Sequence, residues 1–225
     1  MKDWKTGTRL GIGFALVLAL VAAIAAIGVM RLQHVGEATR EMTSHALQKE
    51  RLAAGWLMAT SSNSVRGFSA LKTDDAELQD YLQKAMTKTS AQISETQKKL
   101  EAMLSAPEEL ALAEDIKRKR TAYVTLRKDI LKLKADGQAQ DAARLTNEKL
   151  VGTLDAYEGS ILAMADYQRN QIDAASVTID AEYRAGRTQL LVLAAVALLL
   201  GSGLAWLLTR SIVQPIGEAL LIAET

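Results

Sequence analysis

Three polar side chains share one expected helical face with apolar residues. At about 100° per residue, Arg120, Tyr123 and Arg127 fall within an arc of about 80° that also holds Ile116 and Ile130. A face that packs into a small helical core is normally apolar, so the polar residues on it are the informative ones. Two inward guanidinium groups need an anion, and we expect a bound ligand to supply it.

Residues of the neighbouring expected helices reach the same layer. Counting about 1.5 Å per residue from the distal turns, Asn63, Arg66 and Ser90 lie about 10 to 21 Å below them, and Tyr157 and Thr153 lie in the same range. A guanidinium group binds a carboxylate through two parallel hydrogen bonds, while Tyr and Ser hydroxyls can bind the remaining oxygens. These residues predict a pocket for a small anionic ligand, an organic acid with two or three carboxylates.

Two other interpretations of the arginines stay open. The segment KRKRTAYVTLRKDI holds six basic residues in fourteen, and such runs are usually solvated faces with ion pairs to neighbours such as Glu114, Asp115 and Asp129. Alternatively, the arginines lie in a dimer interface. Arg66 and Asn63, beside Trp56, can equally pair across that interface.

Composition excludes several other chemistries. The chain has no cysteine and two histidines, His34 and His45, too few for a zinc site without further ligands. No Ser/His/Asp set or phosphate-binding loop stands out, so we expect neither an enzyme nor a cofactor. Residues 31–187 carry 23 basic and 23 acidic side chains, which argues against a nucleic-acid partner.

Two uncharged apolar runs enclose that central segment. Residues 10–30 and 188–209 number 21 and 22, enough to cross a hydrocarbon core of about 30 Å. Lys2, Lys5, Arg9 and Arg210 flank the outer ends, so both termini are expected in the cytoplasm and residues 31–187 in the periplasm, with the chain in a bacterial inner membrane. A cleaved signal peptide is the competing interpretation of the first run, but its apolar stretch is longer than is usual there.

The elements that position these residues are all expected to be helical. Two prolines, 4% aromatic residues and long runs with a period of three to four residues favour long helices. We expect helices ending near residue 72, then at 76–104, 107–134 and 138–145, and a last one starting near Thr146 or Asn147. The expected caps are Asp74 with Glu77, Ser105 with Glu108, and Gly137 at a helix end. The predicted fold class is all-α, an antiparallel up-down-up-down four-helix bundle between two transmembrane helices.

The end of the chain resembles the start of a HAMP domain, the relay module that follows the second span of bacterial transmembrane receptors. The matching residues are Arg210, Ile212, Pro215, Ile216, Leu220 and Ala223. Together with the span, bundle, span order and an amino terminus of the type KxGTRLGxGF, the chain resembles the four-helix-bundle subgroup of methyl-accepting chemotaxis proteins. The expected organisation is a cytoplasmic N-terminus at 1–9, a transmembrane helix at 10–30, a ligand-binding domain at 31–187, a second transmembrane helix at 188–209, and a truncated HAMP domain at 210–225.

That resemblance implies a chemoreceptor that forms homodimers, and possible higher assemblies, and whose full-length form controls a chemotaxis histidine kinase through an adaptor. The spacing R-x-x-Y-x-x-x-R, with a hydroxyl residue on the preceding helix, also resembles family members that sense tricarboxylic-cycle acids, which implies ligand contacts from Ser90, Arg120, Tyr123 and Arg127. Two alternatives remain: the input half of a sensor histidine kinase or cyclase, and a structural membrane bundle without a ligand.

Overall fold

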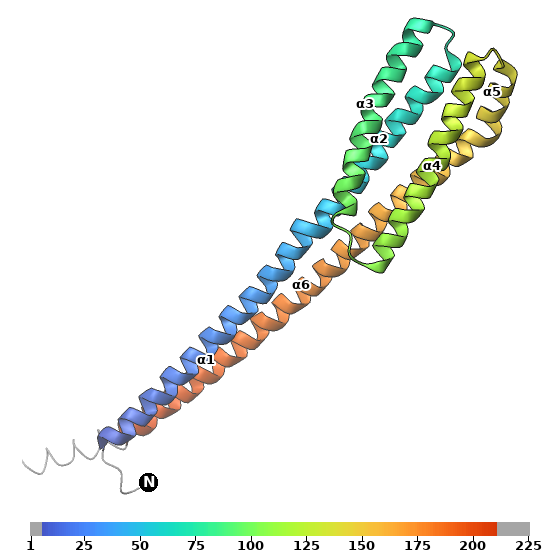
Figure 1. Ribbon diagram of the computed structural model, residues 1–225. Helices are drawn as coiled ribbons and strands as arrows, with labels where there is room; N and C mark the ends of the chain where they lie inside the picture. The colour runs from blue at the N-terminus through green and yellow to red at the C-terminus, as the bar shows by residue number, and fades with distance from the viewer. Residues whose placement is uncertain (1–5, 211–225) are drawn as a thin grey trace, which may run out of the picture. The chain divides into compact units, whose positions relative to one another are not determined.

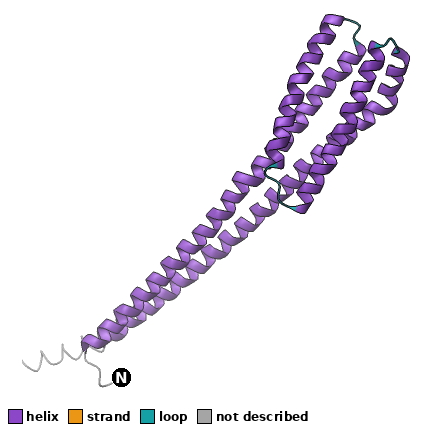
Figure 2. Cartoon of the chain, viewed as in Figure 1, coloured by secondary structure: helices purple, strands orange, loops and turns teal. Residues whose placement is uncertain are grey.

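The computed structural model describes residues 6–210, and every regular element in this part of the chain is a helix (Figures 1 and 2). This confirms the all-α four-helix fold. The elements in chain order are α1 Thr6–Glu41, the π-helical turn η1 Met42–Ala46, α2 Leu47–Lys72, α3 Ala76–Glu101, α4 Pro107–Ala135, α5 Ala139–Leu145, the π-helical turn η2 Thr146–Leu150, and α6 Val151–Leu208.

The chain divides into two compact units. One comprises Arg40–Ala175, which we call the bundle, and the other comprises the described residues up to Thr39 and from Ser176 onward, which we call the helix pair. The boundaries fall inside α1 and α6. Each unit is described by itself below.

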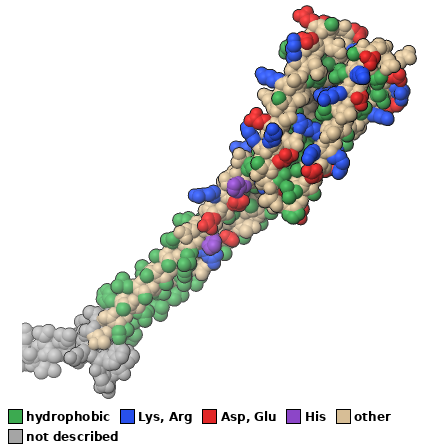
Figure 3. Space-filling view, viewed as in Figure 1, with side chains coloured by type: hydrophobic (Ala, Val, Ile, Leu, Met, Phe, Trp, Pro, Cys, Tyr) green, Lys and Arg blue, Asp and Glu red, His purple; other side chains and the backbone are tan. Residues whose placement is uncertain are grey.

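In the helix pair, parts of α1 and α6 lie side by side. The Arg31 guanidinium donates from Nη2 to Oε1 of Gln189 at 3.0 Å, and Gly28 faces the Leu190 side chain. Two helical stretches, Gly11–Lys72 and Ala139–Leu207, contain segments long and apolar enough to cross a membrane. Figure 3 shows hydrophobic side chains over much of the stretch that holds the two apolar runs, as a lipid environment requires.

The bundle has a core to which all four long helices contribute. On α4, Ile116, Tyr123, Arg127 and Ile130 are buried, so the predicted face is the one that packs inward. On α3, the helical spacing of Leu82, Met86, Ser90, Ile93, Gln97 and Leu100 predicts one inward face, and Met86, Ile93 and Leu100 of this set are buried. On α6, the spacing of Leu154, Tyr157, Ile161, Ala165 and Gln168 predicts another, and all five are buried.

The inward face of α2 differs slightly from the one that we expected. Its buried residues are Ala53, Trp56, Thr60, Asn63, Ser64, Gly67 and Ala70. Helical steps of three and four predict Leu52, Trp56, Ala59, Asn63, Arg66 and Ala70 on this face. Trp56, Asn63 and Ala70 are buried, Leu52 and Ala59 are partly buried against the core, and Arg66 turns to Thr89. Small and hydroxyl-bearing residues occupy much of the buried face, so the pattern of hydrophobic residues alone located this face only to within one residue.

The helix ends use caps one residue away from those predicted. Asp75, not Asp74, caps α3, and its Oδ1 accepts from the backbone N–H groups of Glu77 and Leu78 at 2.9 and 3.1 Å. At the start of α4, Glu109 instead of Glu108 accepts from the backbone N–H groups before the helix. Gly137 ends α4 with φ +80, as predicted for a left-handed glycine.

The expected helix start at Thr146 or Asn147 is wrong. The chain passes from α5 through the π-helical turn η2 directly into α6, and Thr146 turns its hydroxyl back to the carbonyl of Ala142 at 2.7 Å. A threonine that bonds to its own helix in this way does not act as a cap. Among the residues expected at the cytoplasmic ends, Lys2, Lys5 and those matching the HAMP domain from Ile212 to Ala223 lie outside the described residues.

Candidate functional site

The bundle contains a pocket of about 240 Å³ to which α2, α3, α4 and α6 all contribute. Its lining is mostly polar: Thr60, Asn63, Gln83, Thr87, Ser90, Ile93, Arg120, Tyr123, Val124, Arg127, Lys128 and Tyr157. A single protomer supplies all twelve of these residues.

Five of the six residues predicted from the sequence line this pocket. They are Asn63, Ser90, Arg120, Tyr123 and Arg127. The sixth, Arg66, does not line it and instead donates from Nη1 to the hydroxyl of Thr89 at 3.1 Å. The ligand contacts themselves stay a prediction.

Arg127 is the most deeply placed charge in the pocket. Its side chain is 8% exposed, and its Nε is buried without a hydrogen-bond partner. The guanidinium carbon lies 5.6 Å from the centre of the Tyr123 ring, a cation–π contact. Among the described residues, no carboxylate comes within ion-pair distance of it, so the positive charge is stabilised by an aromatic ring and not by an anion.

Arg120 reaches across to α3 and binds only neutral groups there. Its guanidinium donates to Oε1 of Gln97, to the hydroxyl of Ser94 at 2.8 Å and to the backbone carbonyl of Ser90 at 3.5 Å. These contacts hold the side chain in position but leave its charge without a counter-ion in the described part of the chain.

The solvated-face interpretation holds for the neighbouring cations and not for these two arginines. Arg118 and Lys119 both pair with Asp115, and Lys117 pairs with Glu114. Those cations are exposed or nearly so, as expected for an outward face. The basic residues of α4 therefore lie on two faces of one helix. Arg118 and its ion-paired neighbours lie on the outward face, whereas Arg120 and Arg127 point away from Glu114 and Asp115.

Two tyrosines form the aromatic wall of the pocket. The rings of Tyr123 and Tyr157 stack with centroids 5.9 Å apart and planes at 27°. Burial raises the pKa of both hydroxyls, although the nearby Arg127 opposes this for Tyr123. Because their pKa values are raised, both tyrosine hydroxyls stay protonated at neutral pH. The hydroxyl of Tyr157 accepts from Nε1 of Trp56 at 2.7 Å and can still donate a hydrogen bond of its own to an anion.

Asn63 supplies a further unsatisfied group. Its Nδ2 donates to the carbonyl of Met86 at 3.2 Å and to the hydroxyl of Ser90 at 3.1 Å. Its Oδ1 is buried without a partner. Buried polar atoms in a native fold normally have partners, so Asn63 Oδ1 and Arg127 Nε point to a polar ligand or water in the pocket.

The sequence predictions missed several lining residues. Thr60 lies three residues before Asn63, a helical step that marked it as a candidate for the same face. Gln83, Thr87 and Lys128 are exposed, and no periodicity distinguishes them from surface residues. Thr153, which was placed in the same layer, lines a different surface groove.

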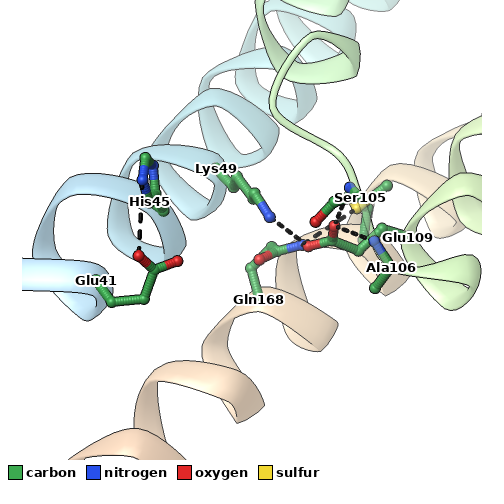
Figure 4. Close-up of polar contacts among 8 residues, drawn as sticks. Glu41, His45, Lys49, Ser105, Ala106, Glu109 and Gln168 are labelled. Carbon is green, nitrogen blue, oxygen red and sulfur yellow. Dashed lines mark hydrogen bonds and ion pairs between the residues drawn. The ribbon is translucent and has the colours of Figure 1, made fainter. Parts of the chain in front are cut away.

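A second polar cluster lies between α2, α4 and α6 (Figure 4). Oε1 of Glu109 accepts from Lys49 at 2.8 Å and from Gln168 at 2.7 Å, and Oε2 accepts from the backbone N–H of Ser105 and of Ala106. Burial alone would raise the pKa of Glu109, but these four donors lower it to about 2. We assign this cluster to stability, because every polar atom of the carboxylate is engaged by the protein itself.

Metal binding finds no support in the described residues. No group of three or more His, Cys, Asp or Glu side chains converges there. Nε2 of His45 lies 3.7 Å from Oε2 of Glu41, and both side chains are exposed. Figure 4 draws this pair beside the Glu109 cluster.

The family described as four helix bundle sensory module for signal transduction matches the chain over residues 3–194. No curated protein matches the chain. The match includes every residue that lines the pocket, and it ends before residues 210–225, where the HAMP domain was expected.

Proposed function

Because the chain belongs to the family of four-helix-bundle sensory modules for signal transduction, we propose that it is the sensory and transmembrane portion of a bacterial chemoreceptor. In this proposal the pocket binds a small di- or tricarboxylate in the periplasm. The chain crosses the inner membrane twice, has both termini in the cytoplasm and acts as a homodimer. It works by binding and not by catalysis, and its signal leaves through α6 and a HAMP domain toward a histidine kinase.

One observation carries the ligand class. Arg120 and Arg127 line a single pocket, and neither guanidinium has a carboxylate partner in the described chain. A buried, unpaired charge is costly, and a protein retains it where an anion arrives from outside. Two guanidinium groups match two carboxylates, because each can form paired charge-assisted hydrogen bonds.

The remaining lining supports a hydroxylated, compact acid as the ligand. Tyr123 and Tyr157 present hydroxyl donors, and Asn63 presents an unsatisfied acceptor. A pocket of about 240 Å³ admits a ligand of a few carbon atoms and excludes a peptide. Malate and citrate combine carboxylates with a hydroxyl that can donate to the asparagine oxygen.

The input half of a sensor histidine kinase or of a cyclase remains the alternative for the output, since the family description fits each of them. A structural bundle without a ligand remains the alternative for the whole protein. The two unsatisfied buried atoms favour a ligand-binding module over a spacer, because a spacer gains nothing from them.

The test is a thermal-shift titration of the whole chain in a neutral detergent with succinate, malate and citrate. A ligand present at a few hundred times its dissociation constant should stabilise the fold by about 3 kcal/mol. Arg120→Gln and Arg127→Gln should each abolish the shift. Arg118→Gln is the matched control, because this arginine lies on the same helix but pairs with Asp115 at the surface.

An unmoved melting temperature with all three acids removes the support for a carboxylate ligand. If an acid binds and both pocket variants bind it as tightly as the native chain, the site is elsewhere in the molecule. A shift that Arg118→Gln abolishes as well reflects the net charge and not the pocket.

A further inference from the structure

The helix pair contains a second pocket, between α1 and α6. It has a volume of about 560 Å³, and all its lining residues belong to this one unit. The residues expected to bind the sensory ligand take no part in it. Its chemistry therefore has to be explained separately.

The lining of this pocket changes character along the helices. Ile24, Leu190, Leu191 and Ala194 lie within the uncharged apolar runs 10–30 and 188–209. Arg31 and Arg187 are the first charged residues beyond those runs, and Leu32, Val35, Glu182 and Tyr183 extend the lining past them toward one end of the pocket. The pocket is thus apolar where hydrocarbon is expected and cationic where the hydrocarbon ends.

The structure holds Arg31 in place at that end. Gly186 has no side chain, and the aliphatic part of Arg31 packs where one would stand, with its Cδ 3.7 Å from the position of an added Cβ. Nη2 donates to Oε1 of Gln189 at 3.0 Å, which fixes the plane of the guanidinium. The other N–H groups of the fork stay available for an acceptor, because no acid in the described chain forms an ion pair with Arg31.

The other charges near this end do not cancel the two arginines. Arg187, like Arg31, has no acidic partner within ion-pair distance among the described residues. Glu182 is the one acid in the lining, and Arg184 is already paired with Asp180 at 2.8 Å. Two arginines against one glutamate leave the lining with a net charge of +1.

We propose that this pocket binds one anionic phospholipid, with an acyl chain along Ile24 and Ala194 and the phosphate on Arg31 and Arg187. The inference rests on the proposed function only in that it takes α1 and α6 to cross the membrane. Tyr183, which is 58% exposed at the polar end, is of the residue type that anchors at such a boundary.

Charge favours a lipid over a second copy of the chain. A second copy packed symmetrically on this pocket would bring its own Arg31 and Arg187 close to those of the first copy. The positive charges would repel one another, because each copy brings one glutamate against two arginines. A phospholipid such as phosphatidylglycerol brings one negative charge and an apolar chain together, which matches both halves of the lining.

The test is native mass spectrometry of the whole chain in a neutral detergent, titrated with phosphatidylglycerol or with phosphatidylcholine of the same acyl length. We expect one phosphatidylglycerol per chain, bound more tightly than phosphatidylcholine. Each of Arg31→Gln and Arg187→Gln should weaken phosphatidylglycerol about fivefold, from the usual strength of one basic residue near an anionic lipid. Arg184→Gln is the matched control, and Ala194→Phe, which fills the apolar part, should weaken both lipids.

Equal binding of the two lipids, or binding unchanged in both pocket-arginine variants, overturns the proposal. A second chain bound in this pocket also overturns the proposal. The protein would then be a dimer that Ala194→Phe dissociates and that added lipid does not dissociate.

A separate experiment tests the membrane placement. The chain has no native cysteine, so Asp74→Cys can be labelled in spheroplasts with a membrane-impermeant maleimide. No labelling contradicts the proposed topology, whereas labelling without lipid selectivity contradicts only the lipid site.

Discussion

At the scale of single residues, α4 shows how one residue type serves opposite purposes. Arg118 is an exposed arginine that Asp115 neutralises, whereas Arg127 is buried against the Tyr123 ring with its Nε unpaired. The ion pair of Arg118 contributes little to stability, because surface ion pairs are screened by water and salt. The buried charge of Arg127 lowers the stability of the ligand-free protein, and only a ligand can offset this loss.

Replacing Arg127 by methionine should therefore stabilise the ligand-free chain while abolishing carboxylate binding. Methionine has a similar length and keeps contact with the Tyr123 ring, so the free energy of unfolding should rise by about 1 kcal/mol. Urea unfolding in the absence of organic acids measures this. The control Arg118→Met should change stability by less than about 0.5 kcal/mol. A loss of stability in Arg127→Met would mean that the native pocket already satisfies the guanidinium.

Glu109 is the buried charge whose partners are complete, and its effect should depend on pH. Its pKa is lowered from 4.5 to about 2, so its stabilising contribution is complete above pH 4.5 and is lost as the pH falls toward 2. The whole loss amounts to about 3 kcal/mol. Unfolding free energies of the native chain and of Glu109→Gln, measured between pH 6 and pH 2.5, should converge as the pH falls.

Glu95→Gln is the matched control for this titration. The pKa of Glu95 is also lowered, first by its hydrogen bond to Lys99 on the next turn of α3, but the pair is exposed to solvent. Its removal should leave the pH profile nearly unchanged. Parallel profiles for the native chain and Glu109→Gln would show that the pKa of this carboxyl is the same in the folded and unfolded states.

At the scale of elements, α2 packs a glycine, Gly67, against the side chains of Arg127 and Tyr123. A Cβ added at Gly67 would lie 3.6 Å from Cδ of Arg127 and 3.6 Å from the sulfur of Met86, which is ordinary contact. Gly55 on the same helix has nothing within 4 Å of its added Cβ. The two positions therefore differ in surroundings and share their helical backbone.

Gly67→Ala and Gly55→Ala should both stabilise the bundle by about 0.5–1 kcal/mol, because alanine is the better helix former. Leucine should separate the two positions. Gly67→Leu must displace Arg127 or Met86 and should abolish ligand binding, whereas Gly55→Leu should leave binding intact. Thermal unfolding and acid titration of the four variants give the comparison, and intact binding in Gly67→Leu would place the ligand away from Arg127.

Helix existence and the inward faces of α3, α4 and α6 were predictable, because their large apolar residues recur at helical steps. The turn residues were identified to within one position, since Asp74 and Asp75, or Glu108 and Glu109, offer the same chemistry and only the backbone decides between them. The π-helical turn η2 was not predictable. Thr146 is a common capping residue, and only the tertiary setting turned its hydroxyl backward.

Five of the six proposed site residues meet in one pocket because helical periodicity and height alone bring them there. Arg66 failed the same reasoning, since a long side chain on the edge of a helical face can turn either way, and here it turns to Thr89. The cluster of Glu109, Lys49 and Gln168 was missed because its members are far apart in the sequence and form no pattern along any one helix.

At the scale of the whole molecule, the two units keep their stability in different ways. The bundle buries its own core, including Trp56 at 2% exposure. In the helix pair, large apolar side chains such as Leu18 and Leu198 are exposed, and in detergent their helices depend on backbone hydrogen bonds and the surrounding hydrocarbon. Urea acts on the first kind of stability far more than on the second.

A double variant, Trp4→Phe with Trp206→Phe, leaves Trp56 as the one tryptophan in the chain. In detergent, we expect urea to shift the fluorescence of Trp56 in a single cooperative transition, while circular dichroism falls in parallel to a plateau that retains helix. The retained fraction belongs to the helix pair. Complete loss of helicity together with the Trp56 transition would show that the two units unfold as one.

The π-helical turn η2 also determines how the bundle responds to the deletion of a residue at this point. A single π-helical turn is equivalent to an α-helix that has accepted one extra residue. Deletion of one residue from 146–150 would thus restore regular α-helix and leave α5 and the start of α6 on the faces that they now have. A chain one residue shorter at this point should therefore keep Tyr157 in the pocket lining, so the bundle can absorb a change of length here without losing the contribution of α6 to the site.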